Sequence, residues 1–124
     1  MNSSTTFKVL QVNLNRSAQA TESALQVTVE LNIDLVIVQE PWIIPREVGS
    51  NDYKGTRSIL YQSFSQILLA DLILRLRVLV YTSKSFRPTV SLAKESPLDP
   101  DILVIDIIEG DYKIQLVNIY NEVN

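Results

Sequence analysis

The clearest pattern in the chain is a run of four apolar residues, Leu-Val-Ile-Val at 35–38, which lies between Asp34 and Gln39-Glu40-Pro41. Short, mostly β-branched apolar runs between turn-type neighbours are typical of strands buried on both faces, as in the interior of an α/β or mixed sheet. Proline cannot continue such a strand, so Pro41 is expected to end it. We therefore predict a buried strand that closes with Gln39 and Glu40.

A strand and a helix are predicted to precede this buried strand. Residues 7–12 are rich in Val and Leu and predict a first strand that ends at Asn13. Residues 13–17 predict a turn into a helix at 18–31, with Ser17 as the N-cap. The apolar face of this helix is expected to consist of Ala18, Ala24, Leu25, Val29 and Leu31. A strand–helix–strand unit of this length places its two strands parallel, or nearly adjacent in one sheet.

The rest of the chain predicts more strands joined by long connections. Leu76, Val78 and Val80 alternate with other residues in a strand at 75–82, and residues 102–108 and 113–120 predict an antiparallel hairpin around Glu109-Gly110-Asp111. Residues 41–56 predict a long surface loop, residues 84–100 a connection with three prolines, and residues 58–69 show no clear pattern. The fold class predicted is α/β, with about one sheet of five or more mixed strands and one main helix.

Composition narrows the chemistry more than the fold. The 124 residues are enough for one domain, and they include no Cys and no His. The commonest general base near neutral pH and the commonest zinc ligand are therefore absent. Chemistry carried by this chain must use carboxylates, amides, hydroxyls, Lys or Arg, and an oxygen-preferring cation such as Mg²⁺ is the expected metal.

Charge and hydropathy bear on partners and location. The net charge of −3 argues mildly against a freestanding nucleic-acid binder. Neither a membrane span nor a signal peptide is predicted, so we expect an intracellular protein, nuclear or cytoplasmic, with no membrane partner.

Candidate site residues stand where the predicted strands end: Asn13, Glu40, and Tyr120 followed by Asn121. If these ends share one edge of the sheet, Asn13 and Glu40 could bind Mg²⁺ and the Tyr120 hydroxyl could donate to a phosphate oxygen. Structural alternatives exist for each. Glu40 could be a solvated boundary residue, Asn13 could serve a turn, and Tyr120 could be an ordinary aromatic strand residue.

Three more residues have both a functional and a structural interpretation. Arg75 and Arg77 could contact phosphates, although alternating charge on a solvent-facing side of a strand is commoner. Trp42 could stack on a base, although a Trp just after a buried strand usually packs as a lid on the core.

The segments KVLQVNLNRS at 8–17 and LVIVQEPW at 35–42 together resemble a known family. They are similar to the amino-terminal half of the endonuclease/exonuclease/phosphatase superfamily, and more closely to the apurinic-type endonuclease domain of fungal non-LTR (LINE-like) retrotransposons. The resemblance continues through SFSQIL, RLRVLVY, SPLDPD and VNIYN, at 63–68, 75–81, 96–101 and 117–121.

The resemblance implies a two-sheet α/β sandwich that nicks DNA with Mg²⁺, so that a free 3′ hydroxyl primes reverse transcription. It implies that Asn13 is the amide beside the metal and the phosphate, that Glu40 is the metal ligand, and that Tyr120 contacts the phosphate. In such a reaction the cation neutralises developing charge while a base activates water for in-line attack.

The chain also departs from the family pattern. The family's second half supplies a Gly-Asp-Phe-Asn type motif, a further Asp and a terminal Ser-Asp-His, whereas this sequence stops at Asn124 and contains no His. We therefore expect residues 1–124 to form a single partial domain, truncated before the second half and inactive alone. An apolar face left open is expected to bind a second copy or the missing half, with DNA only a weak partner of this acidic chain.

Two alternatives of other classes stay open. One is a non-enzymatic protein-interaction module or self-associating relic. The other is a complete small phosphatase, whose replacement metal ligands would come from Asp52, Asp101, Asp106 and Asp111.

Overall fold

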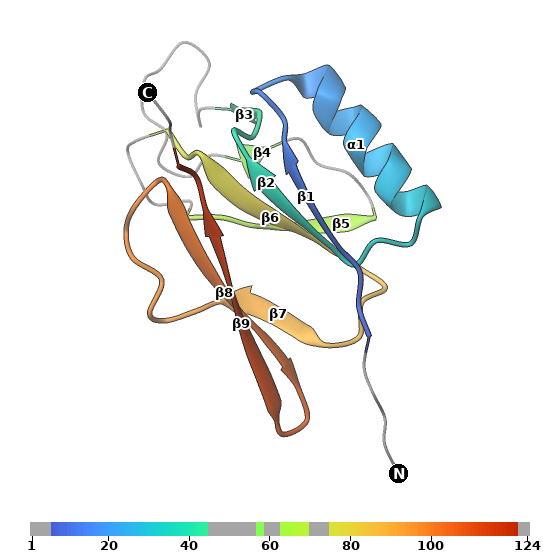
Figure 1. Ribbon diagram of the computed structural model, residues 1–124, viewed down its shortest axis with the longest axis vertical. Coiled ribbons are helices and arrows are strands. Elements are labelled where there is room, and N and C mark those ends of the chain that lie inside the picture. Colours follow the sequence, from blue (N-terminus) through green and yellow to red (C-terminus); the bar gives the residue numbers. More distant parts are fainter. Residues whose placement is uncertain (1–5, 45–56, 59–62, 70–74, 122–124) are drawn as a thin grey trace.

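The computed structural model describes residues 6–44, 57–58, 63–69 and 75–121. These residues form one helix and nine strands (Figure 1). The elements in chain order are β1 (Val9–Asn13), α1 (Ala18–Glu30), β2 (Leu35–Gln39), β3 (Ile43–Ile44), β4 (Arg57–Ser58), β5 (Phe64–Ile67), β6 (Val78–Ser83), β7 (Thr89–Leu92), β8 (Ile102–Glu109) and β9 (Tyr112–Ile119).

The main sheet has four strands in the order β1-β2-β6-β5. β1 and β2 run parallel with α1 between them in sequence, and the other two pairings are antiparallel. All five residues of β2 are buried, because β2 lies inside the sheet and both of its faces are covered. The buried strand ends at Gln39, one residue earlier than predicted, because the backbone of Glu40 turns into the left-handed region at φ 49°.

A second sheet packs against the first and has three antiparallel strands in the order β7-β8-β9. Leu103, Ile105 and Ile107 alternate along β8 and are buried in the same apolar cluster as Leu35 and Val38 of β2. The two layers, with α1 beside the main sheet in Figure 1, make a mixed α/β sandwich. A separate pair, β3 and β4, is short and antiparallel.

Most local predictions are confirmed. The parallel β1–β2 pair, the buried β2 and the β8–β9 hairpin all form, the hairpin closing from Glu109↔Tyr112 through Gly110 in the left-handed region at φ 58°. The Ser17 hydroxyl accepts a hydrogen bond from the Ala20 N–H at 3.0 Å, so Ser17 is the N-cap of α1.

The predicted apolar face of the helix was wrong in part. Leu25 is buried, but Val29 and Leu31 are exposed, and the buried positions beside Leu25 are Thr21 and Thr28. Threonine is tolerated there because each hydroxyl donates to a backbone carbonyl, Thr21 to Ser17 and Thr28 to Leu25, both at 2.7 Å.

The strands are also divided differently from the prediction. The expected sheet of five or more strands is replaced by a four-stranded and a three-stranded sheet, since the β8–β9 hairpin pairs with β7 and not with β6. β7 lies inside the predicted connection at 84–100, and β5 lies in the segment without a clear pattern. Of the predicted loop at 41–56, β3 occupies 43–44, and residues 45–56 lie outside the described ranges.

Candidate functional site

The parallel register of β1 and β2 brings Asn13 and Glu40 to the same end of the main sheet. Asn13 is paired with Gln39, the residue before Glu40. Beyond the strand ends, the Leu14 N–H donates to the Gln39 carbonyl at 3.0 Å and the Arg16 N–H donates to the Glu40 carbonyl at 2.8 Å. The backbone around both candidate residues is thus fixed by main-chain hydrogen bonds.

Tyr120 reaches the same place from the second sheet. Its hydroxyl donates to Glu40 Oε1 at 2.8 Å, and its backbone N–H donates to the Asp101 carbonyl at 2.8 Å. The structure therefore brings Asn13, Glu40 and Tyr120 together, while their roles in catalysis and metal binding stay predictions. Asn121, which follows Tyr120, is exposed.

The backbone at this site adopts an unusual conformation. Asn15, Arg16 and Glu40 have φ values of 50°, 58° and 49°, in the left-handed region that residues with a Cβ rarely adopt. Asn13 Oδ1 accepts a hydrogen bond from the Asn15 N–H at 2.8 Å, so Asn13 also serves the turn, as its structural alternative anticipates. An amide oxygen has two lone pairs, so this bond leaves one for another donor or for a cation.

A buried amide pair lies directly beneath the site and was not predicted. Gln39 Nε2 donates to Asn118 Oδ1 at 2.7 Å, and Asn118 Nδ2 donates to the carbonyls of Val38 and Leu79 at 3.0 and 2.9 Å. Asn118 is only 1% exposed. This network joins β9 to β2 and β6, two residues before Tyr120 and one before Glu40.

An ion pair beside the site was also missed. Arg77 Nε lies 2.6 Å from Asp101 Oδ1, and Arg77 Nη2 donates to Asp101 Oδ2 at 3.1 Å. The Arg77 guanidinium carbon is 5.1 Å from the centre of the Tyr120 ring, and the Arg77 carbonyl accepts from the Glu40 N–H at 2.9 Å. Arg77 is thus half-buried and tied to the candidate residues, not free on a solvent face.

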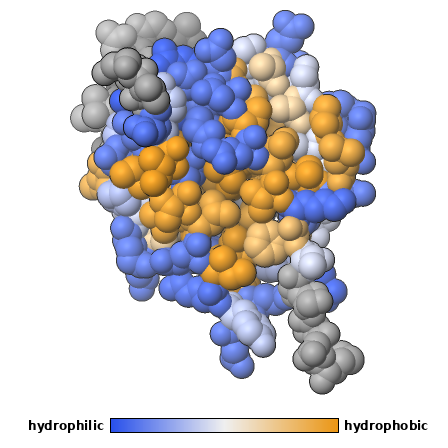
Figure 2. All heavy atoms as spheres, in the orientation of Figure 1, coloured by the Kyte–Doolittle hydropathy of each residue, from blue (hydrophilic) through white to orange (hydrophobic). Residues whose placement is uncertain are grey.

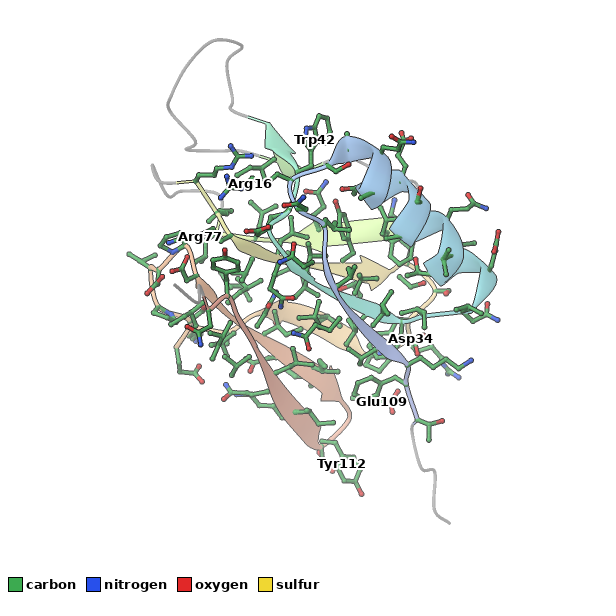
Figure 3. The ribbon with its side chains drawn as sticks, turned by 45° about the horizontal axis from the view of Figure 1, so that its top comes forward. Arg16, Asp34, Trp42, Arg77, Glu109 and Tyr112 are labelled. Carbon is green, nitrogen blue, oxygen red and sulfur yellow. The ribbon has the colours of Figure 1, made fainter. Side chains whose placement is uncertain are left out.

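Other cationic and aromatic groups lie at the same end of the molecule. Figure 3 shows Arg16, Trp42 and Arg77 together there, and Asp34, Glu109 and Tyr112 at the opposite end. Trp42 is half-buried and Arg16 is exposed. Two hollows, of about 280 and 300 Å³, share Asp34 and Ser85 and so lie away from the candidate site.

The donors present fit a hard cation only in part. Glu40 Oε2 and the second lone pair of Asn13 Oδ1 are oxygen ligands of the kind Mg²⁺ prefers. Within the described ranges, no three Asp, Glu, His or Cys side chains gather as a metal-binding group. Water and phosphate oxygens would have to complete the coordination sphere, which is the common arrangement for Mg²⁺.

The replacement ligands of the phosphatase alternative do not gather at the site. Asp101 is held by Arg77, and Asp111 lies in the β8–β9 turn. Asp106 accepts from Gln115 Nε2 at 2.9 Å and lies 3.7 Å from Lys113 Nζ. Asp52 lies outside the described residues.

Comparison with known proteins shows a likeness to a solved structure. No family model and none of the curated proteins matches the chain. Among solved structures, the chain is similar to the endonuclease domain of TRAS1, a telomere-specific non-LTR retrotransposon, with a TM-score of 0.66 and 18% sequence identity. The match covers 94% of this chain and 45% of that chain, so the present sequence spans less than half of its structural neighbour.

The match establishes the fold. The α/β sandwich described above is shared with part of a retrotransposon endonuclease domain, in agreement with the fold class predicted from the sequence. α1, the helix that the structure describes, is neither long nor apolar enough to span a membrane.

Proposed function

We propose that this chain forms the first part of a retrotransposon-type endonuclease domain, whose reaction is Mg²⁺-dependent cleavage of a DNA phosphodiester, and that it does not complete this reaction alone. One observation carries the proposal: within a fold shared with the TRAS1 endonuclease domain, Asn13, Glu40 and Tyr120 meet at one end of the sandwich. The source would be a fungal LINE-like element, the substrate DNA, and the location the nucleus or cytoplasm.

Each residue has a distinct part in this proposal. Glu40 and Asn13 would hold the cation, which supplies charge neutralisation at the phosphate. Tyr120 would exchange its hydrogen bond to Glu40 for one to a phosphate oxygen. Arg77, paired with Asp101 and 5.1 Å from the Tyr120 ring, would hold Tyr120 in position.

The missing element is a base for the attacking water. The chain contains no His, and of the carboxylates near the site, Glu40 is the proposed metal ligand and Asp101 is paired with Arg77. Acid–base assistance contributes roughly a hundredfold to ten-thousandfold to such rates. We therefore expect the isolated chain to have a family-type site but no nuclease activity.

Metal binding can be tested without activity. Paramagnetic Mn²⁺ titrated into the ¹⁵N-labelled chain should first broaden the amide signals of residues 13–16 and of Glu40. Glu40→Gln should abolish that broadening because it removes the anionic ligand, while Glu109→Gln, at the opposite end of the molecule, should leave it unchanged. Broadening that persists in Glu40→Gln, or that centres on the β8–β9 turn, would refute the metal site.

Activity needs a separate assay. Supercoiled plasmid incubated with the wild-type chain and Mg²⁺ should stay intact. Nicking that disappears in Glu40→Ala would show that the chain alone is an enzyme and would overturn the second half of the proposal.

A second candidate function is a non-enzymatic interaction module. The observation that favours it is the exposure of apolar side chains along β9, where Ile114, Val117 and Ile119 are each about half exposed. If neither Mn²⁺ binding nor nicking is found, binding through this strand is the remaining function.

A further inference from the structure

The carboxylate of Glu40 and the hydroxyl of Tyr120 are hydrogen-bonded to each other in the structure. The hydroxyl donates to Glu40 Oε1 at 2.8 Å, an ordinary length for an O–H···O bond. A hydrogen bond whose acceptor is an ionised carboxylate is stronger than one between neutral groups. The two side chains that the proposed function assigns to the cation and to the phosphate therefore satisfy each other's polar groups.

The site lies at a hydrophilic end of the molecule. β1 and β2 end toward the top of Figure 1, and in the same orientation Figure 2 shows mainly hydrophilic residues there, above a band of hydrophobic ones. Glu40 and Tyr120 are both partly exposed. Hydrated ions can therefore reach the Glu40–Tyr120 hydrogen bond from solvent.

Main-chain contacts hold both partners of this hydrogen bond. The Glu40 N–H donates to the Arg77 carbonyl at 2.9 Å, and the Glu40 carbonyl accepts from the Arg16 N–H at 2.8 Å. The Tyr120 N–H donates to the Asp101 carbonyl at 2.8 Å, and the Tyr120 ring lies 5.1 Å from the Arg77 guanidinium carbon. The Tyr120 hydroxyl can therefore change its acceptor by rotation about its C–O bond, while the ring stays in place.

The hydroxyl has a single proton to donate, so Glu40 and a phosphate oxygen compete for it. The carboxylate meets the converse competition. A hydrogen bond that stabilises its negative charge is weakened when a cation neutralises that charge, and the lost hydrogen-bond energy reduces the affinity for the cation. Cation binding at Glu40 is therefore opposed for as long as the Tyr120 hydroxyl donates to it.

The nearby guanidinium has its own carboxylate. Arg77 Nε and Nη2 donate to the two carboxylate oxygens of Asp101, at 2.6 and 3.1 Å. The charge of Arg77 is therefore largely balanced by Asp101 and does not depend on Glu40. The Tyr120 hydroxyl is thus the donor through which Glu40 senses an incoming phosphate.

We propose that the Tyr120 hydroxyl couples the two ligands of the site. It opposes cation binding while it donates to Glu40, and a phosphodiester that accepts its hydrogen bond removes this opposition. The cation and the phosphodiester then strengthen each other's binding by the same factor, because a coupling free energy between two bound ligands is reciprocal. The inference rests on the proposed function, since it takes Glu40 as the cation ligand and a phosphodiester as the anion.

Mn²⁺ titration of ¹⁵N-labelled variants tests the coupling. Tyr120→Phe removes the hydroxyl and keeps the ring. It should lower the dissociation constant of Mn²⁺ alone by about fivefold, as read from the broadening of the amide signals of residues 13–16. Tyr112→Phe is the matched control, because it removes the hydroxyl of a tyrosine that is 78% exposed at the opposite end of the molecule, and it should leave the constant unchanged.

A second titration adds excess dimethyl phosphate, a simple phosphodiester. The wild type and Tyr120→Phe should then bind Mn²⁺ equally well, because the phosphate oxygen accepts the wild-type hydroxyl. Comparing the two proteins at one phosphate concentration cancels the binding of Mn²⁺ to phosphate in solution. If Tyr120→Phe fails to fold, O-methyltyrosine at position 120 gives the same comparison, since it keeps the ring and the oxygen but lacks the donor proton.

The possible failures are distinguishable. A wild-type chain that binds no Mn²⁺ overturns the proposed function and the coupling together. Mn²⁺ binding that Tyr120→Phe leaves unchanged or weakens overturns the coupling alone, because the hydroxyl then does not oppose the cation. A wild type that still binds Mn²⁺ more weakly than Tyr120→Phe in excess dimethyl phosphate also overturns the coupling alone.

Discussion

β2 and β9 contribute to the same site from opposite environments. All five residues of β2 are buried, whereas Asn118 is the only buried residue among the eight of β9. Glu40 follows the first strand and Tyr120 follows the second, and their side chains are hydrogen-bonded. The Glu40–Tyr120 hydrogen bond therefore joins β2, which is fixed by packing, to β9, which is mostly exposed to solvent.

Near the site, the hydrogen bonds of one buried amide, Asn118, hold β9 in place, whereas apolar packing on both faces holds β2. β2 is held by its neighbours on both faces, but near the site β9 is held by Asn118, which bonds to Gln39, Val38 and Leu79. In a low-dielectric interior a hydrogen bond is stronger, and a polar group that loses its partner there costs more free energy. The relative position of Tyr120 and Glu40 should thus depend on Asn118 more than on any residue exposed along β9.

The largest effect is expected at Asn118. Asn118→Leu keeps the branched shape and the number of heavy side-chain atoms, but it removes three hydrogen bonds and leaves Nε2 of the buried Gln39 without its acceptor. We expect a loss of about 3 kcal/mol in the free energy of unfolding, measured by urea denaturation. Asn121→Leu, at an exposed position, is the control and should change stability by less than about 0.5 kcal/mol. Equal effects at the two positions would contradict the role given to the network.

Matched valine substitutions should destabilise the protein more on β2 than on β9, and both should cost less than Asn118→Leu. Val38→Ala on β2 removes two methyl groups from a side chain that is 0% exposed and should cost about 2 kcal/mol. Val117→Ala on β9 removes the same groups from a half-exposed side chain and should cost less than about 0.5 kcal/mol. Both values should be measured at a concentration where the chain is monomeric. If Val117→Ala costs as much as Val38→Ala, the contrast between the strands does not hold.

The smallest effect is expected at the partly exposed ion pair. Arg77→Lys keeps the charge but loses the two-pronged contact with Asp101 and the planar contact with the Tyr120 ring. We expect a cost of about 1 kcal/mol in thermal or urea unfolding. Lys113→Gln breaks the longer and more exposed pair with Asp106 and should cost less than about 0.5 kcal/mol. A reversed order of these two effects would show that Arg77 does not tie Tyr120 in place.

Local sequence patterns predicted the elements whose structure is determined by their own residues. The run at 35–38 predicted β2 because every position in it is apolar, and Ser17 was identified as a cap from its place before an apolar period. The β8–β9 hairpin followed from two strand-like segments around Gly110. β7 was missed because Thr89–Leu92 is mostly exposed and lies between prolines, so its stability comes from pairing with β8 and not from its own sequence.

The candidate site likewise combines contacts that local sequence patterns predict with contacts that depend on tertiary packing. The convergence of Asn13 and Glu40 could be predicted because a parallel β-α-β unit aligns its strand ends. The Tyr120 contact depends on how the second sheet packs against the first, which no local pattern encodes. For Arg77 the sequence left phosphate contact and a solvent face open, and the alternation of Leu76, Val78 and Val80 favoured the solvent face. However, Leu79 and Tyr81 are buried as well, and a continuous apolar run after Arg77 was the available signal that β6 is covered on both faces.

Under the proposed function, the left-handed backbone at Glu40 sets the stability of the fold against the needs of the site. A residue with a Cβ costs about 1 to 2 kcal/mol in this conformation, and glycine would adopt it at little cost. Selection for stability alone would favour glycine at position 40, and it would remove the carboxylate. Under the proposed function, the glutamate at this strained turn is kept for its carboxylate, and a chain freed from that function would gain stability by changing position 40 to glycine.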